Sequence, residues 1–181
     1  MAKLIDGKKV AASIREEVAS EVSRLREYGI APRLAVILAG EDPASVLYSR
    51  SMEKACLSVG VDFELFNLPG ASSGDEVVDL IQRLNDDDSI HGIMIMLPLP
   101  RGMNKQKVLE AVSPLKDVDG VHPINRGYIL SNSEGLFPTT PQSCIEIILR
   151  NGIEISGKHA VLVGRGESVG KPLVYMLLNQ N

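Results

Sequence analysis

Tyr48 and Met52 stand four residues apart in the stretch YSRSMEKAC, which follows a Gly-Glu-Asp-Pro turn. Residues four apart share one face of a helix, so these two side chains are expected to point the same way. A tyrosine ring can stack on a flat ligand, whereas methionine can transfer no proton. Lys54, two residues further along, is expected to point elsewhere. The stretch is therefore interpreted as an active-site helix, as one that has lost its catalytic group, or as ordinary core.

A glycine-rich turn is the second candidate. Residues 164–170 read GRGESVG, between an expected strand and an expected helix. Backbone N–H groups at such a turn and at a helix N-terminus bind phosphate. The last glycine interval is one residue longer than in the standard dinucleotide fingerprint. The turn therefore indicates either a nucleotide site or only close packing of a helix on a strand. Arg165 would pair with a 2′-phosphate in the first case and would be a solvated charge in the second.

Two further segments carry rigid or acidic groups. The LPLP sequence at residues 97–100 follows an expected buried strand, at the edge where parallel sheets bind ligands. The motif alone favours a simple strand terminator. Asp117 and Asp119 lie in the sequence KDVDG. A carboxylate there can accept paired hydrogen bonds from an N–H and NH₂ edge such as that of a pterin, or it can cap an Asx turn. Calcium is not expected, because the EF-hand pattern does not continue.

Composition excludes several classes of protein. The chain has 181 residues, a formal net charge of −4 and no basic block, which argues against nucleic-acid binding by bulk electrostatics. Its two cysteines form no C-x-x-C pair, so neither a disulfide scaffold nor a zinc site is expected, and no other metal site is indicated. The apolar runs are shorter than a membrane span. We expect a cytoplasmic protein with no membrane partner.

Apolar periodicity and turn residues predict the order of the elements. Helices are expected at residues 8–28, 43–59, 75–85, 104–111, 141–149 and 171–179, with a short helical piece near 123–130, and strands at 34–39, 62–67, 93–97 and 158–163. Alternating strands and helices indicate an α/β fold with a parallel sheet.

The domain organisation follows from this order. Residues 1–140 are expected to form the first domain. Residues 141–181 are expected to form a linker helix and the first strand-turn-helix of an incomplete Rossmann-like domain. One such unit cannot bury both faces of its strand alone. We therefore expect that the second domain continues in a longer product, or that this piece packs on the first domain or on a partner chain.

Five segments together resemble the bifunctional methylenetetrahydrofolate dehydrogenase/methenyltetrahydrofolate cyclohydrolase family. They are PASVLYSRSMEKAC, GIMIMLPLP, PLKDVDGVHPINRG, FPTTPQSC and GKHAVLVGRGESVGKPL, in the family's order and roughly its spacing. The resemblance covers residues 4–181 and is far more specific than any single motif. It implies an N-terminal parallel-sheet folate domain followed by the start of a Rossmann-like nucleotide-binding domain. It also implies a tetrahydrofolate derivative as substrate, NADP (or NAD) as cofactor, and a homodimer.

The resemblance assigns roles by position. Tyr48 resembles the tyrosine that stacks on the folate's aminobenzoyl ring, and Asp119 the aspartate that binds the pterin; both count as catalytic and substrate-binding positions. Leu97 and Pro98 fall in the substrate site. The positions that fall in the nucleotide loop are Gly164, Arg165, Gly166, Ser168 and Gly170.

Three departures from the family pattern set the functional hypothesis. Met52 stands at the position of the family's acid/base lysine, and Met96 at that of its supporting glutamine. Gly166 stands where the family usually has serine. Cyclohydrolase activity is therefore expected to be impaired, and the single strand-turn-helix predicts no tight NADP binding by the 181-residue chain.

Two alternatives to a family enzyme remain open. One is a non-catalytic relative that binds folate or forms a heterodimer with an intact paralogue. The other is an unrelated α/β nucleotide-binding module.

Overall fold

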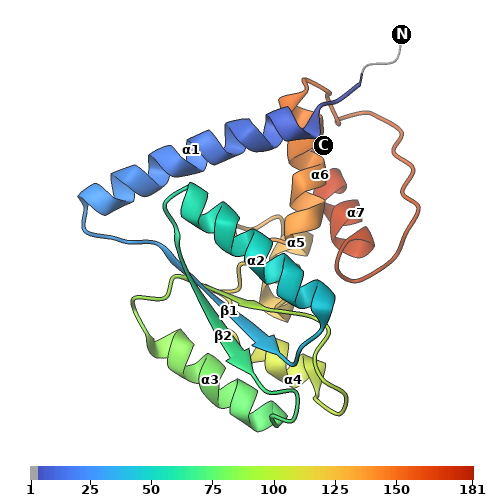
Figure 1. The fold of residues 1–181 in the computed structure, drawn as a ribbon. Helices are drawn as coiled ribbons and strands as arrows, with labels where there is room; N and C mark the ends of the chain where they lie inside the picture. Colours follow the sequence, from blue (N-terminus) through green and yellow to red (C-terminus); the bar gives the residue numbers. More distant parts are fainter. Residues whose placement is uncertain (1–3) are drawn as a thin grey trace. The chain divides into compact units, whose positions relative to one another are not determined.

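The structure, a computed structural model, describes residues 4–181. The backbone divides into two compact units: one is Arg15–Asp117, and the other joins the N-terminal segment through Ile14 to Val118–Asn181. Helix α1 (Gly7–Glu27) supplies residues to both units, and Figure 1 traces the course of the chain. Among the described residues, no helix is long and apolar enough to cross a membrane.

A three-stranded parallel sheet forms the centre of the Arg15–Asp117 unit. Its strands are β1 (Arg33–Ala39), β2 (Asp62–Leu68) and β3 (Gly92–Ile95), in the order β2-β1-β3. The central strand is the most apolar, and its last five residues are buried. A parallel strand buried on both faces requires such a continuous apolar run.

Helices α2 (Pro43–Ser58), α3 (Gly74–Asp86) and α4 (Lys105–Glu110) connect and follow these strands. Figure 1 shows the strands running between α2 and α3. Alternate residues of β1 face opposite sides of the sheet. On one side Val36 and Leu38 form a buried cluster with Met96. On the other side Ala35 and Ile37 are fully buried.

Three short helices make up most of the second unit: α5 (Pro123–Ser131), α6 (Thr139–Arg150) and α7 (Gly170–Leu178). Their shared core consists of Ile129, Ile145 and Met176, one residue from each helix. Helix α5 begins where the Nδ1 atom of His122 accepts the N–H of Ile124 at 3.1 Å. This capping fixes the point at which the acidic loop becomes a helix.

The predicted helices and the first three strands are confirmed, with bounds that shift by a few residues. The predicted strand at residues 158–163 is wrong, because the backbone there has no regular secondary structure. A strand needs a neighbouring edge for its hydrogen bonds. No other strand exists among the described residues of the Val118–Asn181 unit. The side chains of Val161 and Val163 are accordingly 78% and 99% exposed.

Candidate functional site

Ser45 connects the turn that follows β1 with the turn that follows β3. The carboxylate of Asp42 caps α2 by accepting the backbone N–H of Ser45 at 2.9 Å and its hydroxyl at 2.8 Å. The same hydroxyl lies 3.2 Å from the carbonyl oxygen of Leu97. Hydrogen bonds from the backbone and side chain of Ser45 lower the pKa of Asp42 below its ordinary value. The start of α2 is thus tied to the LPLP turn at the carboxyl edge of the sheet.

Tyr48 lies one turn further along α2 and is 54% exposed. Its neighbour Ser49 is 1% exposed and donates its hydroxyl to the carbonyl of Val46 at 2.9 Å. The contrast shows that α2 buries one face and presents the tyrosine on another. Lys54 is exposed, so it does not substitute for a group at position 52 within the buried face.

Met52 and Met96 belong to one apolar cluster. Met96 is 4% exposed and clusters with Val36 and Leu38, and Met52 is half-buried against that cluster. The backbone N–H of Met96 donates to the carbonyl of Ile37 at 2.9 Å, which continues the pairing of β3 with β1. The two positions that were expected to depart from the family pattern therefore lie in one apolar cluster. Their thioethers fill the space with polarizable apolar atoms that carry no acid or base.

The LPLP turn begins with a cis peptide bond between Leu97 and Pro98. Leu97 is half-buried and Pro98 is exposed. The other end of the turn approaches the loop after β1, where a Cβ added to Gly40 would lie 3.7 Å from Cγ of Pro100. Gly40 has a φ of 89°, which favours glycine. The two loops thus lie close together at the end of the sheet where a ligand is expected.

Asp119 belongs to the other compact unit, so the structure does not group it with Tyr48. It is half-buried, and its Oδ1 accepts the hydroxyl of Thr139 at 3.3 Å. The next residue, Gly120, packs against the backbone of Phe137 and Pro138 so closely that an added Cβ would overlap both. This close approach places the acidic loop beside the first turn of α6.

Three residues of the site were missed from the sequence, namely Asp42, Ser45 and Thr139. The first two lie in a Pro-Ala-Ser helix start preceded by aspartate, which is a recognisable N-cap signal. Thr139 and Asp119 are twenty residues apart in the sequence, so no local sequence pattern predicts their contact.

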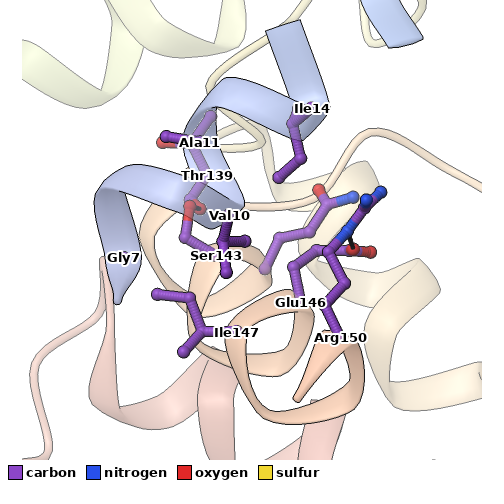
Figure 2. A pocket seen from close by; sticks show the side chains of 10 residues that line it. Gly7, Val10, Ala11, Ile14, Thr139, Ser143, Glu146, Ile147 and Arg150 are labelled. Atoms are coloured by element: carbon purple, nitrogen blue, oxygen red, sulfur yellow. Dashed lines mark hydrogen bonds and ion pairs between the residues drawn. The ribbon is translucent and has the colours of Figure 1, made fainter. Parts of the chain in front are cut away.

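A cavity of about 420 Å³ lies between the N-terminal part of α1 and one side of α6, along the length of α6 (Figure 2). Val10, Ile14 and Ile147 give it an apolar lining. Glu146 and Arg150 form an ion pair at 2.8 Å on its α6 side. Of the predicted site residues none lines this cavity, although Thr139, the partner of Asp119, does.

The glycine-rich turn folds back on the start of α7. A Cβ added to Gly170 would lie 2.5 Å from the carbonyl oxygen of Gly164, so only glycine fits there. The N–H of Lys171 donates to the carbonyl of Gly166 at 3.0 Å. No side chain caps α7 at Val169.

The predicted nucleotide-binding side chains in this turn are open to solvent. Arg165, Gly166 and Ser168 are all exposed. A helix N-terminus without a side-chain cap beside exposed backbone is suited to an anion. Among residues 4–181, no three His, Cys, Asp or Glu side chains are placed to share a metal ion.

Comparison with known proteins identifies the fold. The tetrahydrofolate dehydrogenase/cyclohydrolase catalytic domain matches residues 5–119, and the NAD(P)-binding domain of the same family matches residues 138–181. The chain belongs to the tetrahydrofolate dehydrogenase/cyclohydrolase family. The resemblance read from the sequence is therefore confirmed. The predicted fold class, a parallel-sheet α/β domain followed by the start of a Rossmann-like domain, is also confirmed.

Individual members of the family are similar over the whole chain. The bifunctional protein FolD of Pelotomaculum thermopropionicum is 77% identical over 181 residues, which are 100% of this chain and 64% of that protein. The crystal structure of FolD from Campylobacter jejuni superposes with a TM-score of 0.97 at 41% identity, over 98% of this chain and 64% of the other.

A more distant family member carries a cofactor. The dehydrogenase-cyclohydrolase of Trypanosoma brucei, solved with NADP and an inhibitor, gives a TM-score of 0.91 at 32% identity, over 99% of this chain and 62% of that one. This chain thus spans somewhat under two thirds of the length of these family members.

Proposed function

We propose that this chain serves folate one-carbon metabolism as the folate-binding part of an NADP-dependent methylenetetrahydrofolate dehydrogenase/methenyltetrahydrofolate cyclohydrolase, with impaired cyclohydrolase activity. Membership of the family supports the reaction type. The impairment rests on one observation, the apolar packing of Met52 and Met96 in the same cluster.

The chemistry of hydrolysis explains why that cluster matters. Water must add to the methenyl carbon, and protons must move before the ring opens. A positioned acid or base accelerates such proton transfers typically ~10²–10⁴-fold. Neither Met52 nor Met96 can give or take a proton, and Lys54 is exposed on another part of α2. Binding can survive this loss, because it depends on other groups.

Those other groups are proposed from the family pattern. The exposed ring of Tyr48 would stack on the aminobenzoyl group, with Leu97 and Pro98 lining the same turn. Asp119 would accept hydrogen bonds from the pterin edge, and the hydroxyl of Thr139 would hold its carboxylate in place. Each of these residues binds or orients the substrate without moving a proton.

The cofactor proposed for the second unit is NADP, with NAD as an alternative. Gly164, Arg165, Gly166, Ser168 and Gly170 are the residues that would hold its phosphates. The close contact of Gly170 with Gly164 and the uncapped start of α7 fit a phosphate group. When bound, the nicotinamide accepts a hydride from the methylene group, and the protein orients the two. We propose that the 181-residue chain binds NADP weakly, since these residues supply only a turn and a helix, without the preceding strand.

The remaining proposals concern organisation. We propose a boundary near residue 140 between a folate domain and a nucleotide-binding segment, and the family match that begins at 138 supports it. The compact units of the backbone divide earlier, between Asp117 and Val118. We propose a homodimer, or a heterodimer with an intact paralogue, and a cytoplasmic location based on the low cysteine content.

Two measurements on the purified chain test this function. Calorimetric titration with methenyltetrahydrofolate should show binding that Tyr48→Ala weakens, with Tyr28→Ala as the control for an exposed tyrosine outside α2. Absorbance should show hydrolysis at least about a hundredfold slower than in a relative that keeps the lysine and the glutamine. Normal hydrolysis would disprove the impairment, and an absence of folate binding would disprove the function itself.

A second candidate function is a non-catalytic, folate-binding or heterodimerising relative. The same methionine cluster favours it, because both polar members of one constellation are replaced. Turnover separates the two proposals. A measurable dehydrogenase rate with added NADP supports the enzyme, whereas folate binding with no turnover of either kind supports the binding protein. Micromolar NADP affinity of this chain would contradict the proposed weak cofactor binding.

A further inference from the structure

A second, smaller cavity lies between α5 and α7. Its volume is about 190 Å³, and it shares only Glu167 with the glycine-rich turn and no residue with the predicted folate site. The lining residues are Arg126, Ile129, Leu130, Glu167, Lys171, Pro172 and Tyr175. The cavity thus combines a charged rim with apolar walls.

The rim holds more positive than negative charge. Arg126 and Lys171 share a single carboxylate, that of Glu167, at N···O distances of 3.9 and 3.7 Å. Both distances exceed those of a charge-assisted hydrogen bond. The side chains of Glu167 and Lys171 are 69% and 62% exposed, and surface pairs of this kind are weak. One positive charge at this cavity is therefore left without a counter-charge, and the existing carboxylate is easily displaced.

Arg126 has an unused donor. Its Nε atom is buried and finds no hydrogen-bond partner among the described residues. A buried donor without an acceptor destabilises a fold, and most such donors are satisfied in native proteins. The atom has no access to solvent in this conformation, so a ligand oxygen supplies the missing acceptor when the guanidinium turns toward the cavity. A planar guanidinium pairs especially well with a two-oxygen group such as a carboxylate or phosphate.

The other lining residues of this cavity are mostly apolar. Ile129 is 2% exposed, whereas Leu130 and Tyr175 are 59% and 41% exposed. Pro172 adds a rigid ring from the first turn of α7. Open apolar side chains of this kind fit the flat or short hydrocarbon body of a small molecule.

We propose that this cavity binds a small amphipathic anion. Its carboxylate or phosphate group would lie against Arg126 and Lys171, and its aromatic or short aliphatic body would lie on the wall formed by Leu130, Pro172 and Tyr175. Glu167 competes with the ligand for the two cations. Because Glu167 belongs to the glycine-rich turn, binding here would release one contact of that turn.

Benzoate is the probe for the carboxylate form, and phenyl phosphate for the phosphate form. The readout is the ¹H–¹⁵N signal of the Arg126 Nε–H group, which should shift saturably with a Kd of about 1 mM. Benzyl alcohol lacks the charge and inorganic phosphate lacks the apolar body, so each should bind at least about tenfold more weakly.

Variants of the three charged rim residues show whether these residues bind an anion or only hold the glycine-rich turn against α5. Arg126→Gln lacks the Arg126 signal, so its binding is followed by the backbone amides of α5 and α7, and it should weaken benzoate binding at least about tenfold. Lys171→Gln should weaken it about threefold. Glu167→Gln should strengthen it about threefold, because the competing carboxylate is gone. Lys158→Gln, at an exposed lysine outside the cavity, is the matched control and should change nothing. Lys171→Gln and Glu167→Gln change exposed side chains, so they test the site even where Arg126→Gln unfolds the chain.

Three results would overturn the proposal. The first is no saturable shift of the Arg126 signal at about ten times the expected Kd. The second is a benzoate affinity that Glu167→Gln lowers, as expected if the three charges only tie the turn to α5. The third is a signal shift confined to the backbone amides of residues 164–168, which would show that the anion binds at the glycine-rich turn and not in this cavity.

Discussion

The α2 region and the glycine-rich turn hold the two proposed groups of site residues, one in each compact unit, and they contrast in what the structure preserves. Around α2 the scaffold is complete: β3 pairs with β1, and Ser45 ties the helix to the LPLP turn. The expected departures from the family pattern in this region are the side chains at positions 52 and 96. At the turn the glycines are present, but the strand that should precede them is not formed.

The difference shows how chemistry depends on each kind of group. A proton shuttle resides in particular side chains, so two substitutions remove it and leave the packing intact. A phosphate site made of backbone N–H groups tolerates substitution of side chains, such as the expected replacement of the family's serine by Gly166. It depends instead on neighbouring elements that hold the turn. The first region should therefore respond to side-chain changes, and the second to changes in backbone packing.

The largest expected effect is restoration of hydrolysis in the first region. Met52→Lys combined with Met96→Gln should raise the rate of methenyltetrahydrofolate hydrolysis about a hundredfold, because it returns the acid/base group and its supporting amide. Position 52 is half-buried, so a lysine there can pack its stem on the apolar cluster and keep its ammonium group in water. Absorbance of the methenyl substrate measures the rate directly.

Met94→Gln is the matched control for that experiment. Met94 packs against the same cluster, but it stands at no family catalytic position. Combined with Met52→Lys, it should give a clearly smaller gain than the Met52→Lys, Met96→Gln pair, because the lysine returns without its supporting amide. An equal gain from this control pair would mean that any polar group near position 52 restores hydrolysis. The specific role assigned to position 96 would then be wrong.

A smaller effect is expected from backbone packing in the second region. In Gly170→Ala the new methyl group would meet the carbonyl of Gly164 at 2.5 Å, and the backbone on both sides must shift. Overpacking of this kind costs about 1–3 kcal/mol of unfolding free energy. Hydrogen exchange of the α7 amides should accelerate accordingly.

Gly166→Ser provides the contrast within the same turn. A Cβ at Gly166 meets no atom within 4 Å, so stability should change by less than about 0.5 kcal/mol. Equal acceleration of exchange in the two variants would show that close packing of the turn on α7 does not hold this region together.

Much of this comparison was predictable from the sequence, for physical reasons. Helix periodicity and turn residues are local, so the elements of the Arg15–Asp117 unit were predicted with small errors at their ends. The strand at residues 158–163 also had a local signal, but hydrogen bonds with other strands decide whether it forms. The contact of Thr139 with Asp119 and the cavity beside Arg126 bring together residues that are far apart in the sequence. Rules based on local residue spacing therefore cannot predict them.

The smallest effect concerns the link between the start of α2 and the LPLP turn, and it depends on pH. Asp42→Ala removes the helix cap and the partner of the Ser45 hydroxyl, so the melting temperature at neutral pH should fall by several degrees. Because the pKa of Asp42 in the folded chain is below its ordinary value of 3.8, the carboxylate stabilises the fold above that value. Its contribution is lost as the pH falls from 3.8 through the lowered pKa. The melting temperatures of the variant and the parent chain should therefore converge in that acidic range.

Asp88→Ala, at an exposed aspartate whose side chain caps no helix, is the control and should show no such convergence. A gap between parent and Asp42→Ala that persists unchanged at the lowest pH would mean that packing, and not the charged cap, joins this helix to the turn.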